Sequence, residues 1–137
     1  MDNKKVKVIQ DAYAAFGRGD IDALLGFLAE DVDWQTFGPA EIPTMGPRKG
    51  RAEVGWFFKQ VGETWHFDRF EPRQFIAQGD LVVSLGFYNG KAKTTGRPFS
   101  SEFAHIFTVK GGKVVQFREY TDTANLMASL ALSLSHA

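Results

Sequence analysis

Cysteine is absent from this chain of 137 residues, and so is a net charge of either sign. Without cysteine there is no disulfide framework, no zinc–thiolate site and no thiol nucleophile, a composition that suits the cytosol. The 16 basic residues balance 16 acidic ones, so no net field draws the chain to nucleic acid or to an anionic membrane surface. We therefore expect neither as a partner.

Long apolar runs are also missing. No apolar core of signal-peptide length follows Lys5, and no run approaches the roughly 18 residues of a membrane-spanning helix. The sequence therefore predicts a soluble, cytoplasmic protein. Its apolar content of 44%, with 13 Phe, is enough for one sizeable core, and the length is typical of a single domain. We expect one domain over residues 1–137.

Three segments have the apolar spacing of helices. The first ends at Gly17-Arg18-Gly19, the second is short and capped by Asp20, and the third runs over roughly 51–63. Each has apolar residues three and four positions apart, the pattern of one buried helix face. The three stripes are Val6, Ile9, Tyr13 and Phe16; Ile21, Leu24, Leu25 and Leu28; and Val54, Phe57, Phe58 and Val61.

Five segments have the pattern of strands. Val32, Trp34 and Thr36 alternate with polar neighbours, and later strands are expected over 67–77, 81–92, 98–109 and 114–121. Tight turns join the last four, which predicts an antiparallel meander. Pro72 indicates an edge strand or a bulge, and Gly86 a bulge or bend.

Two further segments complete the predicted order. Residues 38–50 contain three prolines and few large apolar side chains, which favours a loop at a rim or a lid rather than a packed element. Asp122 is suited to cap a last helix with apolar residues at Leu126, Leu130 and Leu134. The order α-α-β-α-β-β-β-β-α predicts an α+β domain with its helices gathered on one side of an antiparallel sheet.

Short motifs along almost the whole chain carry a family resemblance. They are Ala14-Ala15-Phe16-Gly17-Arg18-Gly19-Asp20, Leu28-Ala29-Glu30-Asp31-Val32-Asp33-Trp34, Gly50-Arg51-Ala52-Glu53, Gly79-Asp80, Thr95-Gly96-Arg97-Pro98, and Gly111-Gly112-Lys113-Val114-Val115 before Phe117-Arg118-Glu119-Tyr120. In combination they resemble the SnoaL-like and ketosteroid-isomerase-like proteins of the nuclear transport factor 2-like superfamily.

The resemblance implies a cone-shaped, cystatin-like fold in which helices and a curved antiparallel sheet enclose a cavity. It also implies frequent dimerisation through the outer sheet face. The chemistries of the superfamily range from isomerisation and aldol cyclisation to dehydration and epoxide hydrolysis, so the fold does not select the reaction. No cofactor is implied.

Glu119 is the first catalytic candidate, because it falls where SnoaL-like cyclases carry an acid that faces the cavity. The side-chain period of two places Phe117 and Thr121 beside it. A carboxyl group among aromatic side chains is costly to ionise and suits proton transfer. The alternative is that Glu119 points outward and pairs with a surface Lys or Arg, which would stabilise the protein little.

His105 is the second candidate. It follows Phe103 by two residues, and the turn at Gly111-Gly112 brings its strand alongside that of Glu119. Facing one cavity, the two would share a proton, with His105 as base or as hydrogen-bond donor. The alternative is a core histidine with a single hydrogen bond. His66 and His136 are too scattered to suggest a metal site, and we expect no bound metal.

The expected ligand is a small hydrophobic molecule. Trp34 and Thr36 lie where the superfamily often places residues that line the pocket, and Tyr88 would add a phenol donor. An aromatic wall with one or two hydroxyls suits a flat, mostly apolar compound with a carbonyl. Ordinary core packing is the alternative, above all for Trp34. The substrate-binding candidates are Trp34, Thr36, Tyr88, Phe103 and Phe117.

Two reactions of the superfamily are disfavoured. Steroid isomerases carry a general-base Asp near the end of the first strand, where this chain reads Gln35-Thr36-Phe37. The epoxide hydrolases need an Arg and an Asp two residues apart in the middle strand, where this chain has Gly86 and Tyr88.

Two hypotheses remain. The first is a cofactor-independent lyase or isomerase, of polyketide-cyclase-like or dehydratase-like chemistry, that acts on a small hydrophobic carbonyl compound. The second is a non-catalytic module for ligand binding or dimerisation. For a homodimer, Gln116, Arg118 and Tyr120 share the outward parity of the last strand and indicate the contact face.

Overall fold

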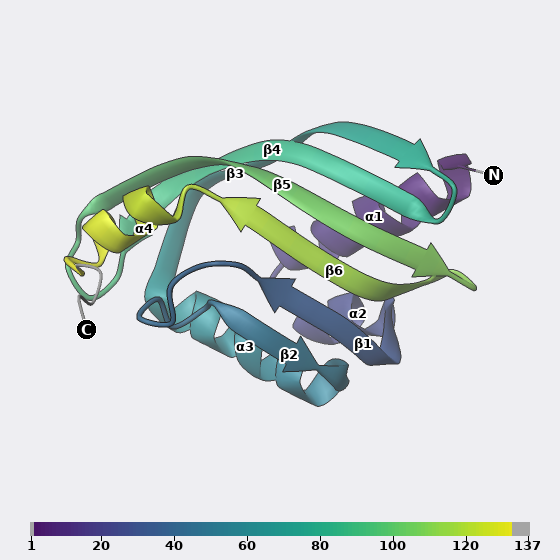
Figure 1. Cartoon of the computed structure of the whole chain (residues 1–137), viewed down its shortest axis with the longest axis horizontal. Coiled ribbons are helices and arrows are strands. Elements are labelled where there is room, and N and C mark those ends of the chain that lie inside the picture. Colours follow the sequence, from purple (N-terminus) through teal and green to yellow (C-terminus); the bar gives the residue numbers. More distant parts are fainter. Residues whose placement is uncertain (1, 133–137) are drawn as a thin grey trace.

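One curved sheet of six strands organises the computed structural model, which describes residues 2–132 (Figure 1). The helices are α1 (Asp2–Gly17), α2 (Ile21–Gly26), α3 (Gly50–Thr64) and α4 (Thr123–Ser129). The strands are β1 (Leu28–Thr36), β2 (Gly46–Lys49), β3 (Trp65–Gln78), β4 (Leu81–Ala92), β5 (Pro98–Lys110) and β6 (Lys113–Thr121). The α+β class and the helices on one side of a curved sheet are confirmed.

The strand order β2-β1-β6-β5-β4-β3 contains the predicted meander from β3 to β6. Every neighbouring pair is antiparallel except β1 and β6, which run parallel. In that pair Trp34 lies opposite Phe117 and Thr36 opposite Glu119. The first long strand of the chain is thereby fixed to the last, and their inward side chains line one wall.

Leu28 was expected on the second helix and instead begins β1. The helix ends at Gly26, while the Asp20 side chain caps its start by accepting from the backbone N–H of Ala23 at 3.1 Å. Leu28 pairs with Val114 of β6. Its carbonyl oxygen accepts from both Nε and a terminal nitrogen of Arg51, at 2.9 and 2.7 Å. These tertiary contacts outweigh the helical spacing.

The predicted loop over 38–50 is present only over 38–45, and its large apolar side chains are packed rather than exposed. Ile42 and Met45 are buried, and Gly46–Lys49 forms β2 against β1. Pro47 removes one backbone donor, but β2 is an edge strand, where a missing donor is tolerated. A strand with the sequence GPRK has no alternation to reveal it.

Pro72 and Gly86 face each other across β3 and β4. The register shifts between Pro72 and Gln74, so the bulge lies on the edge strand β3, as Pro72 indicated. Gly86 itself pairs regularly with Phe103. A Cβ on Gly86 would lie 2.4 Å from the Phe103 ring, so this glycine allows a close approach rather than a bend.

The last helix is shorter than predicted. Asp122 caps it as expected, accepting from the backbone N–H of Asn125 at 3.2 Å, but α4 ends at Ser129 and Leu130 follows it. Leu134 lies outside the described residues. None of the helices in residues 2–132 is long and apolar enough to cross a membrane.

The core has two parts. One lies where α1, α2 and α3 pack on the inner face of the sheet, and it includes Ile9, Val54 and Phe107. The second lies where α4 and the segment before β2 close one end of the sheet, and it includes Ile42 and Leu126. Figure 1 shows α1, α2 and α3 on the same side of the sheet, so that within residues 2–132 no helix covers the other side.

Candidate ligand cavity and its acid–base residues

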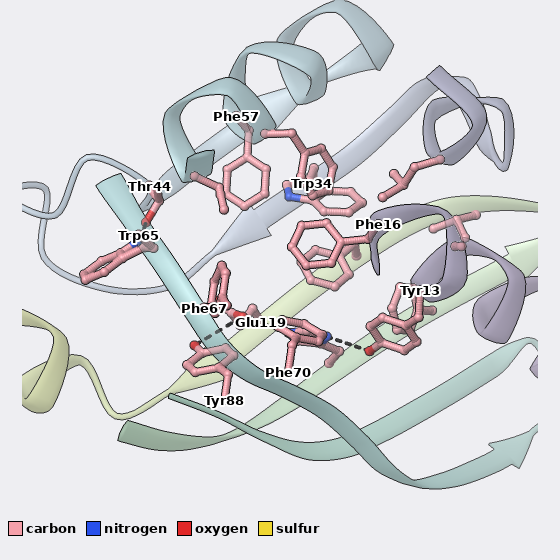
Figure 2. A pocket seen from close by; sticks show the side chains of 18 of the residues that line it. Tyr13, Phe16, Trp34, Thr44, Phe57, Trp65, Phe67, Phe70, Tyr88 and Glu119 are labelled. Atoms are coloured by element: carbon pink, nitrogen blue, oxygen red, sulfur yellow. Dashed lines mark hydrogen bonds and ion pairs between the residues drawn. The ribbon is translucent and has the colours of Figure 1, made fainter. Parts of the chain in front are cut away.

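A cavity of about 100 Å³ lies between the helices and the inner face of the sheet. Aromatic rings from α1, from α3 and from every strand except β2 surround it (Figure 2). Its aromatic lining consists of Tyr13, Phe16, Trp34, Phe57, Phe58, Trp65, Phe67, Phe70, Tyr88, Phe99, Phe107 and Phe117. Polar lining is sparse and comes chiefly from Thr44, His105 and Glu119 together with the two tyrosine hydroxyls.

Strand alternation places the two catalytic candidates on the inner face. Phe117 and Glu119 alternate with outward residues on β6, as Phe103, His105 and Phe107 do on β5. The antiparallel register sets His105 directly opposite Glu119 and Phe107 opposite Phe117. Opposite residues in such a pair have neighbouring side chains, so the structure brings His105 and Glu119 together.

These two side chains form a hydrogen-bonded pair that continues to α1. His105 Nε2 lies 2.7 Å from Glu119 Oε2, and His105 Nδ1 lies 2.7 Å from the Tyr13 hydroxyl oxygen. The His105 and Glu119 side chains are only 6% and 14% exposed. When the Tyr13 hydroxyl donates to Nδ1, the Nε2–H donates to the carboxylate, so a neutral imidazole and a carboxylate satisfy the chain.

Tyr88 stands on the other side of Glu119. Its hydroxyl donates to Thr121 Oγ1 at 2.6 Å and lies 3.5 Å from Glu119 Oε2, so Thr121 is its main partner. Burial, reinforced by the nearby Glu119 carboxylate, raises the pKa of Tyr13 and of Tyr88 well above the usual value. Both phenols therefore stay protonated donors at neutral pH.

Glu119 is the one lining residue that is a carboxylic acid, and neither lysine nor arginine lines the described cavity. Its Oε2 is engaged by His105 and Tyr88, whereas its Oε1 has no hydrogen bond within residues 2–132. No fixed cation is present to receive a ligand carboxylate. The cavity therefore suits an uncharged ligand, with Oε1 as a proton acceptor.

The five predicted substrate-binding residues have different positions. Trp34 and Phe117 both line the cavity and stack at 3.9 Å between ring centroids, and Tyr88 lines it beside Glu119. Phe103 does not line it but stacks on the His105 ring at 4.1 Å. Thr36 does not line it either, because its hydroxyl donates to the Thr44 carbonyl at 2.6 Å.

Three lining residues escaped sequence reasoning as polar participants: Tyr13, Thr44 and Trp65. Trp65 Nε1 donates to Thr44 Oγ1 at 3.3 Å, across the end of the cavity. Tyr13 belongs to an ordinary apolar helix stripe, and its partner His105 lies 92 residues away. Only the inward position of Tyr13 on the first helix could have indicated a role.

A second, outer pocket of about 390 Å³ adjoins the cavity. Its lining includes Gly17 at the end of α1, Gly62 near the end of α3, and His66 and Lys93. The two hollows share the side chains of Tyr13, Phe16, Trp65, Phe67 and Phe70. These five aromatic side chains therefore lie between the cavity and the outer pocket.

The remaining histidines lie away from this site or outside the description. His66 pairs with Asp68 at 3.3 Å on the surface, and His136 is outside the described residues. Within residues 2–132, no three histidine or acidic side chains gather closely enough to hold a metal ion.

A curved sheet that encloses a cavity beneath helices is the arrangement of a nuclear transport factor 2-like protein. The SnoaL-like domain family matches residues 9–117, and the chain belongs to it. No curated protein matches the chain.

Solved structures support the same fold. An NTF2-like protein from Burkholderia xenovorans LB400 is 34% identical over 94% of this chain and 97% of its own, with a TM-score of 0.87. One of unknown function from Burkholderia pseudomallei K96243 is 29% identical over 92% and 96%, with a TM-score of 0.85. TerC, co-crystallized with polyporic acid, is 27% identical over 93% and 98%, with a TM-score of 0.84.

Proposed function

We propose that this protein binds a small, uncharged, planar carbonyl compound in its aromatic cavity and transfers a proton on it, with Glu119 as the acid–base group. The reaction class is that of a cofactor-independent isomerase or lyase. The observation that carries the proposal is the buried Glu119–His105 pair at 2.7 Å in a cavity that is otherwise almost wholly apolar.

The chemistry follows from the carboxylate. Oε1 of Glu119 removes a proton from the carbon next to the ligand carbonyl, and the electrons of that C–H bond form the carbon–carbon double bond of an enolate. The charge that develops on the carbonyl oxygen needs a hydrogen-bond donor in the cavity wall. His105 holds the carboxylate in place, and return of the proton to another carbon completes an isomerisation.

Among the similar structures, one was solved with a small aromatic compound. TerC was co-crystallized with polyporic acid. That compound is an acidic hydroxyquinone and is ionised at neutral pH, so an uncharged ketone is the better probe for a cavity whose described lining has neither lysine nor arginine. The cavity of about 100 Å³ is smaller than the ~150 Å³ cavity in which benzene binds an engineered protein. A two-ring ligand therefore enters only when lining rings turn aside, and Phe16 and Phe58 are lining rings that are only partly buried.

A test needs no knowledge of the natural substrate. The bicyclic ketone 1-tetralone is uncharged and has exchangeable protons next to its carbonyl, so proton transfer incorporates deuterium from D2O. We expect the wild-type protein to accelerate this exchange, and Glu119→Gln to lower the rate by about 10²–10⁴-fold while 1-tetralone still binds. Mass spectrometry measures the exchange, and calorimetry measures binding.

The matched control is Glu102→Gln, because Glu102 is exposed on the same meander and outside the cavity. It should leave the exchange rate unchanged. Binding without accelerated exchange would leave the non-catalytic module as the function. Absence of 1-tetralone binding would refute the ligand-binding proposal itself.

We also propose that two copies associate through the helix-free face of the sheet. Large apolar side chains are exposed there, among them Ile76, Leu85 and Tyr120. The register joins them into one patch, since Ile76 pairs with Val83, Leu85 with Ala104, and Ala104 with Tyr120. A two-fold interface uses one such patch twice, which favours a self-complementary apolar surface.

Sedimentation of Leu85→Lys tests the association. We expect it to sediment as a monomer at concentrations at which the wild-type protein is a dimer. Trp56→Lys is the control, because Trp56 is 63% exposed on α3, away from this face. A wild-type monomer, or a Leu85→Lys dimer, would exclude the patch as the interface.

A further inference from the structure

The indole nitrogen of Trp34 is a buried hydrogen-bond donor with no partner in the described residues. The residue is 4% exposed and lines the cavity. A buried donor without an acceptor costs about 1–3 kcal/mol, and most buried donors in proteins are satisfied. This N–H is therefore a candidate to donate to a ligand, because no acceptor for it lies within residues 2–132.

Packing fixes the direction of this donor. One face of the Trp34 ring stacks on Phe117, with 23° between the planes, and Phe57 and Phe58 lie 5.7 and 5.6 Å away between centroids. Figure 2 shows the nitrogen on the edge of the Trp34 ring that faces Phe57. The N–H therefore lies on the side of Phe57, which also lines the cavity.

The other N–H and phenol donors of the described cavity are already used. Trp65 Nε1 donates to Thr44, both ring nitrogens of His105 are engaged, and Tyr88 donates to Thr121. His105 and Tyr88, which sequence reasoning favoured as donors to a ligand oxygen, would each have to break a hydrogen bond of 2.7 Å or less. Trp34 Nε1 would break none.

Trp34 also lies at a suitable place relative to the acid. It pairs with Phe117, and Glu119 is two residues further along β6 on the same face, an offset of about 7 Å. A ligand can span this offset of about 7 Å, because its carbonyl oxygen and the neighbouring C–H would each make a contact of about 3 Å, one with Trp34 and one with Glu119.

We infer that Trp34 Nε1 is the hydrogen-bond donor for the carbonyl oxygen of the ligand, on the same wall of the cavity as the proton-accepting Oε1 of Glu119. This inference rests on the proposed function and narrows the ligand class to planar ketones or quinones whose oxygen reaches Trp34. In the transition state the same N–H stabilises the charge that develops on that oxygen.

Two probes and two variants test it. The probes are 1-tetralone and tetralin, which has the same ring system without the carbonyl oxygen. Trp34→Phe keeps an aromatic ring but removes the N–H. We expect it to weaken 1-tetralone binding about tenfold, the value of one hydrogen bond, to leave tetralin binding unchanged, and to lower the rate of deuterium exchange.

Trp65→Phe is the matched control, because Trp65 lines the same cavity but its N–H already has a protein acceptor. Trp65→Phe should change the affinities for 1-tetralone and tetralin to the same extent. Equal losses for 1-tetralone and tetralin in Trp34→Phe, or no loss for either, would overturn the inference and leave the proposed function standing. If neither probe binds the wild-type protein, the proposed function fails and the inference with it.

Discussion

Alkaline pH should unfold this protein through its two buried tyrosines. Tyr88 is 5% exposed and the Tyr13 hydroxyl is turned inward to His105, and burial raises the pKa of both phenols in the folded state. In the unfolded chain both ionise near pH 10. Their stabilising contribution is therefore complete below about pH 10 and is lost as the pH rises above it.

The size of the loss follows from proton linkage. Above about pH 10 the unfolded chain has released two protons that the folded chain retains, so the free energy of unfolding falls by about 2.7 kcal/mol per pH unit. Two pH units remove about 5 kcal/mol, which is comparable to the whole stability of an ordinary domain. We therefore expect cooperative unfolding between about pH 11 and pH 12.

Two signals recorded together test this reasoning. Tyrosinate absorbance reports ionisation and far-ultraviolet circular dichroism reports the fold, and the chain has only three tyrosines. Two of them should ionise together with the loss of the fold. Tyr13→Phe and Tyr88→Phe should each halve the dependence of stability on pH above pH 10, to about 1.4 kcal/mol per unit. Ionisation of all three near pH 10, with the dichroism unchanged, would refute the reasoning.

Glycines provide two further predictions. Gly86→Ala should destabilise the protein by about 1–3 kcal/mol in urea unfolding, because its Cβ would press on Phe103. Gly26→Ala, whose Cβ would have no atom within 4 Å, should instead stabilise α2 by about 0.5–1 kcal/mol. Equal effects of the two substitutions on stability would contradict the close packing at Gly86. Gly62→Leu has free space at the outer pocket, so it should slow 1-tetralone association in stopped-flow measurements while Gly26→Leu does not. Unchanged association would place the entrance elsewhere.

The fold was predictable because apolar residues recur at regular spacings along its long helices and strands. Alternation over β4 and β5 identified the inner residues, and Asp20 and Asp122 were sufficient to start their helices. The errors came where a tertiary contact replaced a local signal. Leu28 fits a helix stripe until Arg51 and β6 hold it in a strand, and Gly46–Lys49 becomes a strand only because β1 lies beside it.

The candidate site was predictable in part. The meander and the period of two were enough to place Glu119 and His105 side by side, and the structure has them so. Hydrogen bonds between distant segments left no trace in the sequence, so Tyr13 looked like any core residue. The unsatisfied nitrogen of Trp34 was equally hidden, because a missing partner is visible only when every neighbour is in place.

The parallel pairing of β1 and β6 has a consequence during protein synthesis. β1 has β2 beside it soon after it is made, but its other neighbour is the last strand to leave the ribosome. Trp34 and Glu119 therefore come to lie on one wall only after residue 121 has emerged. A nascent or shortened chain that ends before β6 therefore lacks part of the cavity wall, and the cavity is complete only when the whole sheet has been assembled.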